Sequence, residues 1–182
     1  QFLQEITAVY DAGFRGNIFI VDDNLIGNRR HVKELLRAVT TWQQRRGYPF
    51  NLSTEASIDL ADDPELLKLM RSSGFTMVFI GLETPVHAAL ERIGKRQNLR
   101  GNMVEKVRRI QGEGIEVTAG FIIGFDSDPE DIAERQIRFI QALGVPTAMV
   151  GLLTALPNTR LWERLSTEGR MRFRSGGNNT HT

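Results

Sequence analysis

The chain has 182 residues, of which 41% are hydrophobic and 25% are charged, as is ordinary for a globular protein. Its 23 basic and 22 acidic residues leave a formal net charge of +1, which excludes the strong positive field of a nucleic-acid or anionic-membrane binder. No apolar run approaches the ~20 residues of a membrane span, so we expect a cytoplasmic protein. The absence of cysteine excludes disulfides and thiolate metal sites. Gln1 opens directly into a helical pattern without a signal segment, so we expect the chain to be cut from a longer protein.

Helices and strands alternate strictly along the chain. Apolar residues recur at helical spacing in some segments and form short continuous runs in others, and successive strands start roughly thirty residues apart, the size of one strand-plus-helix unit. The predicted helices cover residues 2–10, 32–42, 63–70, 102–111, 128–143 and 162–165. The predicted strands cover residues 18–21, 50–56, 77–82, 115–123 and 148–153.

The continuous apolar strands predict a parallel sheet with both faces covered. Such a sheet belongs either to a doubly wound fold or to a β/α barrel. A doubly wound nucleotide binder should carry a glycine-rich turn after its first strand, but the loop here reads DDNLIGNRR. We therefore predict an α/β fold, a partial TIM-like β/α barrel with five to six parallel strands and the helices outside. Residues 170–182 are expected to form a poorly ordered tail.

Acidic side chains follow four consecutive predicted strands at their carboxyl ends. With the polar residues beside them, they are Asp22, Asp23, Asn24, Glu55, Glu83, Thr84 and Asp126. The chemistry of a β/α barrel lies at this end of the strands. The repeated arrangement therefore predicts a shared ligand pocket.

Helix capping is the alternative role for acids that precede helices. We expect Asp128 to cap the helix after it, and Asp22 or Asp23 could do the same for theirs. Glu55 and Glu83 are different, because glutamate caps poorly and a buried unpaired carboxylate is costly. The ligand of such a pocket could be magnesium, held by Asp22, Glu55 and Glu83, or a polar small molecule with an amine and hydroxyls.

Histidine and lysine positions disfavour two other barrel chemistries. Zinc or paired-metal hydrolases need histidines at strand ends, and Schiff-base enzymes need a lysine there. His31 and His87 lie on predicted helical segments, and His181 lies in the tail. The lysines fall on helices or, in the case of Lys95, in the segment RIGKRQN.

Five stretches together resemble the radical S-adenosylmethionine (SAM) superfamily. GFIIGF (120–125) resembles the GxIxG motif on the fifth strand of these enzymes, FIGLETP (79–85) their fourth-strand segment, and LSTEAS (52–57) their third. LTALPNTRLWERL (153–165) resembles the Pro-Gly-Thr-x-Leu stretch after the sixth strand. FIVDDNLIGNRRH (19–31) resembles the second-strand segment of the subgroup that often carries a cobalamin-binding domain. Residues 1–169 are thus similar to a radical SAM core, from the helix after strand 1 to the helix after strand 6.

The resemblance implies a SAM pocket and assigns its residues one by one. The turn Asp22-Asp23-Asn24 takes the place of the family's GGE-type turn, whose backbone receives the methionine amino group. Glu55 matches a carboxylate that faces the methionine part. Lys95 or Arg96 falls where a basic residue can meet the cofactor carboxylate.

The ribose and adenine residues follow in the same way. Glu83 and Thr84 match the ribose-binding segment. The residues that would flank adenine are Gly120, Ile122, Gly124, Leu156 and Pro157. Two departures stand out, because Gly120 lies where some relatives carry an acid and Asn158 replaces the glycine usual after proline.

Family chemistry requires a 4Fe-4S cluster on three cysteines spaced CxxxCxxC, and this chain has none. The resemblance therefore implies a parent enzyme that uses SAM and the cluster, with cobalamin as an optional further cofactor. An electron donor such as flavodoxin or ferredoxin and a small-molecule substrate would be its partners, and methyl transfer or rearrangement its reaction. The fragment alone would be inactive. Two alternatives stay open: a carboxylate- and magnesium-dependent β/α-barrel enzyme, and a noncatalytic α/β binding module.

Overall fold

The computed structural model describes residues 1–171 and divides the chain into two compact units, Gln1–Gly151 and Leu152–Thr182. Most of the predicted tail, with His181, lies outside the described residues. The helices are α1 (Phe2–Asp11), α2 (Arg29–Gln44), α3 (Pro64–Ser72), α4 (His87–Arg92), α5 (Met103–Gly112), α6 (Ile132–Leu143) and α7 (Arg160–Thr167). The strands are β1 (Gly16–Ile20), β2 (Phe50–Glu55), β3 (Phe75–Glu83), β4 (Glu116–Ile123) and β5 (Thr147–Leu152). Three short 3₁₀ helices are η1 (Leu25–Gly27), η2 (Ile58–Asp62) and η3 (Arg96–Leu99).

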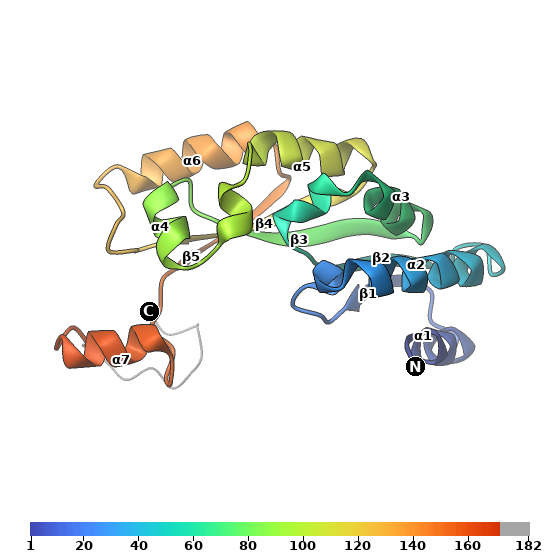
Figure 1. The fold of residues 1–182 in the computed structure, drawn as a ribbon. Coiled ribbons are helices and arrows are strands. Elements are labelled where there is room, and N and C mark those ends of the chain that lie inside the picture. Colours follow the sequence, from blue (N-terminus) through green and yellow to red (C-terminus); the bar gives the residue numbers. More distant parts are fainter. Residues whose placement is uncertain (172–182) are drawn as a thin grey trace. The chain divides into compact units, whose positions relative to one another are not determined.

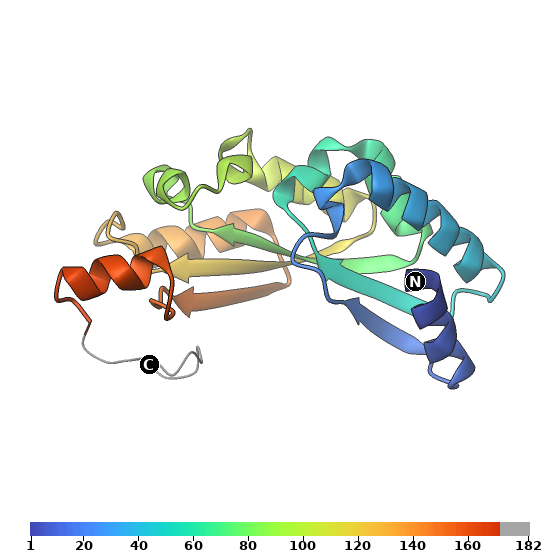
Figure 2. The ribbon, with the colours of Figure 1, turned by 60° about the horizontal axis from the view of Figure 1, so that its bottom comes forward.

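The first unit is built on one sheet whose strands follow the order of the chain, β1-β2-β3-β4-β5 (Figure 1, Figure 2). Strands β1 to β4 pair in parallel, with Ile18 opposite Leu52 and Val78 opposite Val117. A doubly wound sheet would reverse its strand order at a switch point, whereas a barrel adds strands in sequence. The order therefore confirms the predicted partial TIM-like barrel.

The hydrophobic core lies between one face of the sheet and the helices. Leu36 of α2, Leu66 of α3 and Val107 of α5 are almost completely buried, as are Leu52 and Ile80 on the strands. Helices α2, α3 and α5 each contribute a stripe of apolar residues spaced three or four apart, which is the pattern that predicted them, whereas α4 was not predicted. This layer fixes the strands and so fixes the residues that follow their carboxyl ends.

The other face of the sheet is open, so the expectation that both faces are covered was wrong. In β1, Ile18 and Ile20 pack against the core while Asn17 and Phe19 are exposed, and β5 is exposed along its whole length. Val21, predicted as part of the first strand, follows it and is 89% exposed. A barrel covers its inner face only when strands close the circle, and five strands do not close it. The apolar runs show that a strand suits burial on both faces, but not whether enough strands are present to close the barrel over its inner face.

The predicted helix caps are confirmed at the start of α3 but not at the start of α2. Asp63 accepts a hydrogen bond from the backbone N–H of Leu66 at 3.1 Å, and Pro64 follows it, as predicted. Helix α2 is capped by Asn28, whose Oδ1 accepts from the N–H of His31 at 3.1 Å. Neither Asp22 nor Asp23 therefore caps this helix.

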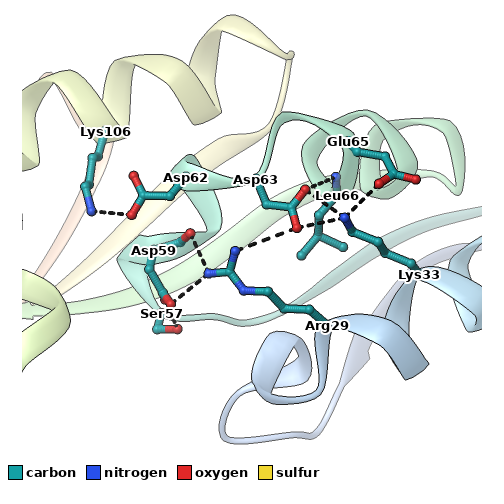
Figure 3. A network of polar contacts seen from close by, with 9 residues as sticks. All are labelled: Arg29, Lys33, Ser57, Asp59, Asp62, Asp63, Glu65, Leu66 and Lys106. Carbon is teal, nitrogen blue, oxygen red and sulfur yellow. Dashed lines mark hydrogen bonds and ion pairs between the residues drawn. The ribbon is translucent and has the colours of Figure 1, made fainter.

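A network of ion pairs joins α2 to the segment that follows β2 (Figure 3). Lys33 Nζ lies 2.9 Å from a carboxylate oxygen of Asp63 and 2.8 Å from one of Glu65. Arg29 binds Asp59 at 2.8 Å and lies 3.7 Å from Asp63. The network fixes the start of α3 against α2, directly after the carboxyl end of β2.

The same contacts set the ionisation of Asp63 and Lys33. Burial acts to raise the pKa of Asp63, but hydrogen bonds from Lys33 and the Leu66 N–H, with the charges of Lys33 and Arg29, outweigh it and lower this pKa. Hydrogen bonds to Glu65 and Asp63 raise the pKa of Lys33. Both groups are thus held in their charged forms.

The second unit is described by itself through residue 171. Its helix α7 is capped by Thr159, whose Oγ1 accepts from the N–H of Trp162 at 3.2 Å. The turn before it is closed by the carbonyl of Leu156, which accepts from the N–H and the hydroxyl of Thr159 at 3.3 and 2.7 Å. Asn158 has φ +65° in this turn. Asparagine tolerates the left-handed region better than most residues, which explains how it stands where the family usually has glycine.

Candidate functional site

Polar side chains from the carboxyl ends of β1, β2 and β3 surround one hollow of about 270 Å³. Its lining residues are Asp23, Asn24, Glu55, Ala56, Ser57, Phe79, Gly81, Glu83, Lys95 and Gln97. This is the end of the sheet where β/α-barrel enzymes carry their chemistry. Small-molecule pockets are usually about 300–1,000 Å³, so the hollow is sized for part of a cofactor.

Asn24 ties the loop after β1 to the loop after β2. Its Oδ1 accepts hydrogen bonds from the N–H of Ser57 at 3.1 Å and from the Ser57 hydroxyl at 3.3 Å. Asp22 accepts from the N–H of Asn24 at 2.9 Å, which makes a local turn. Asp22 lines a second hollow of about 590 Å³ beside α1, β1 and α2. Asp23 and Asn24 therefore line the same hollow as Glu55, although Asn24 borders the second hollow too, while Asp22 shapes the turn that carries them.

Glu83 lies in a strained backbone conformation. It has φ +67°, and the N–H of Thr84 donates to the carbonyl of Leu82 at 2.9 Å across it. A positive φ with this hydrogen bond marks the rare, strained form of γ-turn. The pairing of β3 with β4 shifts register between Gly81 and Glu83. Strain of this kind gathers at functional sites.

The Glu83 side chain is 12% exposed and pairs with Lys95 across the hollow. Glu83 Oε1 lies 2.8 Å from Lys95 Nζ, and Lys95 is 35% exposed. A Cβ atom on Gly81 would lie 2.6 Å from Glu83 Oε1 and 3.2 Å from Lys95 Nζ. The glycine therefore leaves the room that the ion pair occupies. Sequence reasoning missed Gly81, although a glycine inside a strand pattern is a known sign of close approach.

Thr84 and Arg96 were predicted for the site but do not line the hollow. Thr84 is completely buried, and its Oγ1 accepts from the N–H of Val86 at 3.2 Å. Arg96 is exposed at the start of η3. Lys95, not Arg96, is thus the basic residue of the hollow. Gln97, which sequence reasoning missed, lines it as well.

On β4, Gly120 is buried beneath the ring of Phe79. A Cβ on Gly120 would lie 2.7 Å from Phe79 Cζ, so this position has no room for a side chain. Ile122, two residues further along the strand, is half-buried. Of these three residues only Phe79 lines the hollow, so Gly120 and Ile122, which were predicted for the site, lie outside its wall.

The loop after β4 is closed by Asp128, which does not cap α6 as predicted. Its Oδ2 accepts from the N–H of Gly124 at 2.7 Å and from the N–H of Phe125 at 2.9 Å. Helix α6 begins later, at Ile132, with Asp131 before it. Gly124 has φ +105°, which lets the chain turn back toward Asp128.

The family model described as the radical SAM superfamily matches residues 1–140. The chain belongs to the radical SAM superfamily. This confirms the family expected from the five motifs.

Two curated relatives match nearly the whole chain. It is 45% identical, over all 182 residues, to an uncharacterised methyltransferase of Synechocystis sp., covering 34% of that protein. It is 40% identical over 171 residues to the hopanoid C-2 methylase of Rhodopseudomonas palustris, covering 94% of this chain and 32% of that protein. The chain therefore spans about a third of the length of the curated relatives it matches.

Solved structures show the same fold. The radical SAM methyltransferase TsrM from Kitasatospora setae, solved with cobalamin and a 4Fe-4S cluster bound, aligns with a TM-score of 0.76 and 16% identity, over 96% of this chain and 34% of that chain. The cobalamin-dependent SAM radical enzyme OxsB aligns with a TM-score of 0.60 and 22% identity, over 80% of this chain and 22% of that chain. At these identities the likeness establishes the fold, a partial TIM-like barrel.

Metal ligands do not gather in the part of this radical SAM chain that the structure describes. Within residues 1–171, no three acidic or histidine side chains are arranged to hold a metal ion. The magnesium site proposed on Asp22, Glu55 and Glu83 is not formed, because Asp22 lines the other hollow and Glu83 pairs with Lys95.

Every helix in residues 1–171 is too short or too polar to span a bilayer. Leu156 and Pro157 belong to the second unit, so their contact with adenine stays a prediction.

Proposed function

We propose that this chain forms the SAM-binding part of a radical SAM methyltransferase. The observation that carries the proposal is the hollow in which Glu55, Glu83 and Lys95 meet at the carboxyl ends of the strands. SAM bears an ammonium, a carboxylate and two ribose hydroxyls, so a site for it needs both acidic and basic groups. The two carboxylates and the ammonium group in the hollow match the charges and hydroxyls of SAM.

The methionine end of SAM would lie between β1 and β2. Asp23, Asn24 and Glu55 line this part of the hollow, and the carboxylates of Asp23 and Glu55 would accept from the ammonium group. Asn24, whose Oδ1 is bound to Ser57, would hold the two loops in place. Lys95 offers its ammonium to the cofactor carboxylate. Asp22 would act indirectly, by holding the turn through its bond to the Asn24 N–H.

Glu83 would accept hydrogen bonds from the ribose hydroxyls. In the structure its carboxylate is bound to Lys95, which is one-third exposed. Because Glu83 is only 12% exposed, breaking this pair would be costly unless both charges found new partners, and SAM would offer them: ribose hydroxyls to Glu83 and a carboxylate to Lys95. The turn that carries Glu83 already aims it into the hollow.

Apolar and backbone surface beside the hollow would receive adenine. Phe79 of β3 lines the hollow, Gly120 and Ile122 of the neighbouring β4 would extend this surface, and Gly124 exposes backbone at the strand end. From the sequence motif alone, Leu156 and Pro157 are also proposed as adenine contacts. Thr84 would support the ribose segment through its bond to the Val86 N–H.

SAM supplies a methyl group and, with a 4Fe-4S cluster, a source of radical chemistry. The chain has no cysteine, so the ligands of such a cluster would come from outside this sequence, and residues 1–182 alone would be inactive. Cobalamin, a flavodoxin or ferredoxin electron donor and a small-molecule substrate belong to the same proposal. Methyl transfer is favoured over rearrangement because both curated relatives are named as methyltransferase or methylase.

The test is a SAM titration of the full-length protein containing this chain, prepared anaerobically. Glu83→Ala and Glu55→Gln each remove a charge-assisted hydrogen bond worth about 1.5–3 kcal/mol, so affinity should fall about ten- to a hundredfold. Glu116→Gln is the matched control, because Glu116 is an exposed acid at the opposite end of β4. Wild-type affinity in both hollow variants would refute the proposal.

A further inference from the structure

The strained turn at Glu83 requires neighbouring groups to hold it. A residue with a side chain rarely adopts φ +67°, and such a conformation persists only where the surroundings determine it. One contact is internal, from the Thr84 N–H to the Leu82 carbonyl. A second is the ion pair between Glu83 and Lys95. The ladder also pairs Glu83 with Phe121 of β4, beyond the register shift. None of these contacts ties the carbonyls of Gly81 and Leu82, just before Glu83, to the backbone of the segment that carries Lys95.

Asn98 supplies that tie. Its side chain is almost fully buried, and its Nδ2 donates to the carbonyl oxygens of Gly81 and Leu82, both at 3.1 Å. The Leu82 carbonyl thus accepts from Asn98 and from Thr84 together. A side-chain amide carries two N–H donors and so can bind both carbonyls, which a carboxylate cannot do.

Asn98 also belongs to the segment that carries Lys95. It lies in η3, and its backbone N–H donates to the carbonyl of Lys95 at 3.0 Å. Asn98 therefore joins the backbone of Lys95 to the backbone of the two residues near the start of the Glu83 turn, Gly81 and Leu82. Asn98 itself does not line the hollow.

We propose that Asn98 is a positioning residue that locks the end of β3 in the turn presenting Glu83 to SAM and holds Lys95 opposite it. The inference rests on the proposed function of the hollow and adds a residue that acts only through others. Loss of the two hydrogen bonds would let the strained turn relax and carry the Glu83 carboxylate away from its place.

Gln43 of α2 provides a matched control at the opposite end of the sheet. It is fully buried, and its Nε2 donates to the carbonyls of Phe50 at 2.8 Å and Ser73 at 3.2 Å. Among the described residues, the side-chain oxygens of Gln43 and Asn98 both lack a hydrogen-bond partner. Gln43 differs in place, because it binds at the amino ends of β2 and β3, away from the hollow. Both amides stabilise the fold, but only that of Asn98 is hydrogen-bonded to the residues that lead into Glu83.

The experiment compares Asn98→Leu with Gln43→Met in the full-length protein. Both variants should unfold at lower urea concentration, because each removes two hydrogen bonds from a buried side-chain amide to backbone carbonyls. Only Asn98→Leu should weaken SAM binding, by at least about fivefold, and speed amide hydrogen exchange at residues 82–84. If Asn98→Leu does not fold, Asn98→Ser takes its place, with the same expectations.

The outcomes separate this inference from the proposed function. Wild-type SAM affinity in the Asn98 variant, with a loss in Glu83→Ala, would overturn the positioning role alone. An equal loss of affinity in Gln43→Met would also overturn it, since the effect would then be general destabilisation. If Glu55→Gln and Glu83→Ala both bind SAM normally, the proposed function fails. Hydrogen exchange then still decides the positioning role, and unchanged exchange at residues 82–84 overturns it.

Discussion

Replacing Gly120 with alanine should destabilise the sheet beside the hollow. Gly120 pairs with Gly81 across β3 and β4, and the Phe79 ring covers it. An added Cβ would lie 2.7, 3.3 and 3.7 Å from three atoms of that ring. The shortest of these distances is well inside van der Waals contact, so the ring must move or the strands must separate.

The expected size of the effect follows from two opposing terms. Forcing a methyl group into a packed site costs about 1–3 kcal/mol. Alanine in place of glycine returns about 0.4–1 kcal/mol by restricting the unfolded chain, provided that the backbone suits it. Gly120 is not among the glycines with positive φ, so its backbone does suit alanine. We therefore expect a net loss of about 1 kcal/mol in the free energy of unfolding.

Urea unfolding measures this loss, with Gly151→Ala as the matched control. Gly151 also lies in a strand without positive φ, but nothing lies within 4 Å of its would-be Cβ. The control should be neutral or slightly stabilising. Shortening the ring with Phe79→Leu should reduce the cost of Gly120→Ala in the double variant. Equal stability of Gly120→Ala and Gly151→Ala would refute the reasoning, because it would mean that the ring is not fixed over Gly120.

Two further predictions concern polar contacts outside the hollow. Asp63→Asn keeps an oxygen for the Leu66 N–H but removes the negative charge. Because folding lowers the pKa of Asp63 below its ordinary 3.8, the carboxylate stabilises the protein above that pH, and this stabilisation is lost as the pH falls. The difference in unfolding free energy between wild type and variant should therefore shrink when urea titrations are taken from neutral pH to below about 4, and a constant difference would contradict this. Asp128→Ala should lower the unfolding free energy by about 1–2 kcal/mol, since the N–H groups of Gly124 and Phe125 lose their acceptor. Asp128→Asn retains an acceptor oxygen and should be milder, which thermal melts of the three proteins would check.

Local patterns were enough to determine the order and type of the main elements. The strand predicted at 50–56 is β2, and the Asp63-Pro64 pair begins α3 as predicted. These features depend on neighbours in the chain, because a helix repeats every 3.6 residues and a cap needs only the next turn. The five motifs likewise identified the superfamily, which the family model confirms.

Helix caps were predicted less well than the helices themselves. Asp128 stands before a proline, as Asp63 does, yet it binds back to the loop after β4. Asp22 makes a turn of its own, and Asn28 caps α2 instead. An aspartate can accept from any N–H that the fold brings to it, so its partner depends on the path of the loop more than on the residue after it.

Which polar residues share the hollow was decided by the tertiary structure alone. The sequence placed acids at strand ends, but only the fold separated Asp22 from Asp23 and brought Lys95 to Glu83. The left-handed conformation of Glu83 coincides with the register shift between β3 and β4, and Asn98 binds it from a later segment. Such features arise from contacts between segments distant in the chain, which local periodicity does not encode.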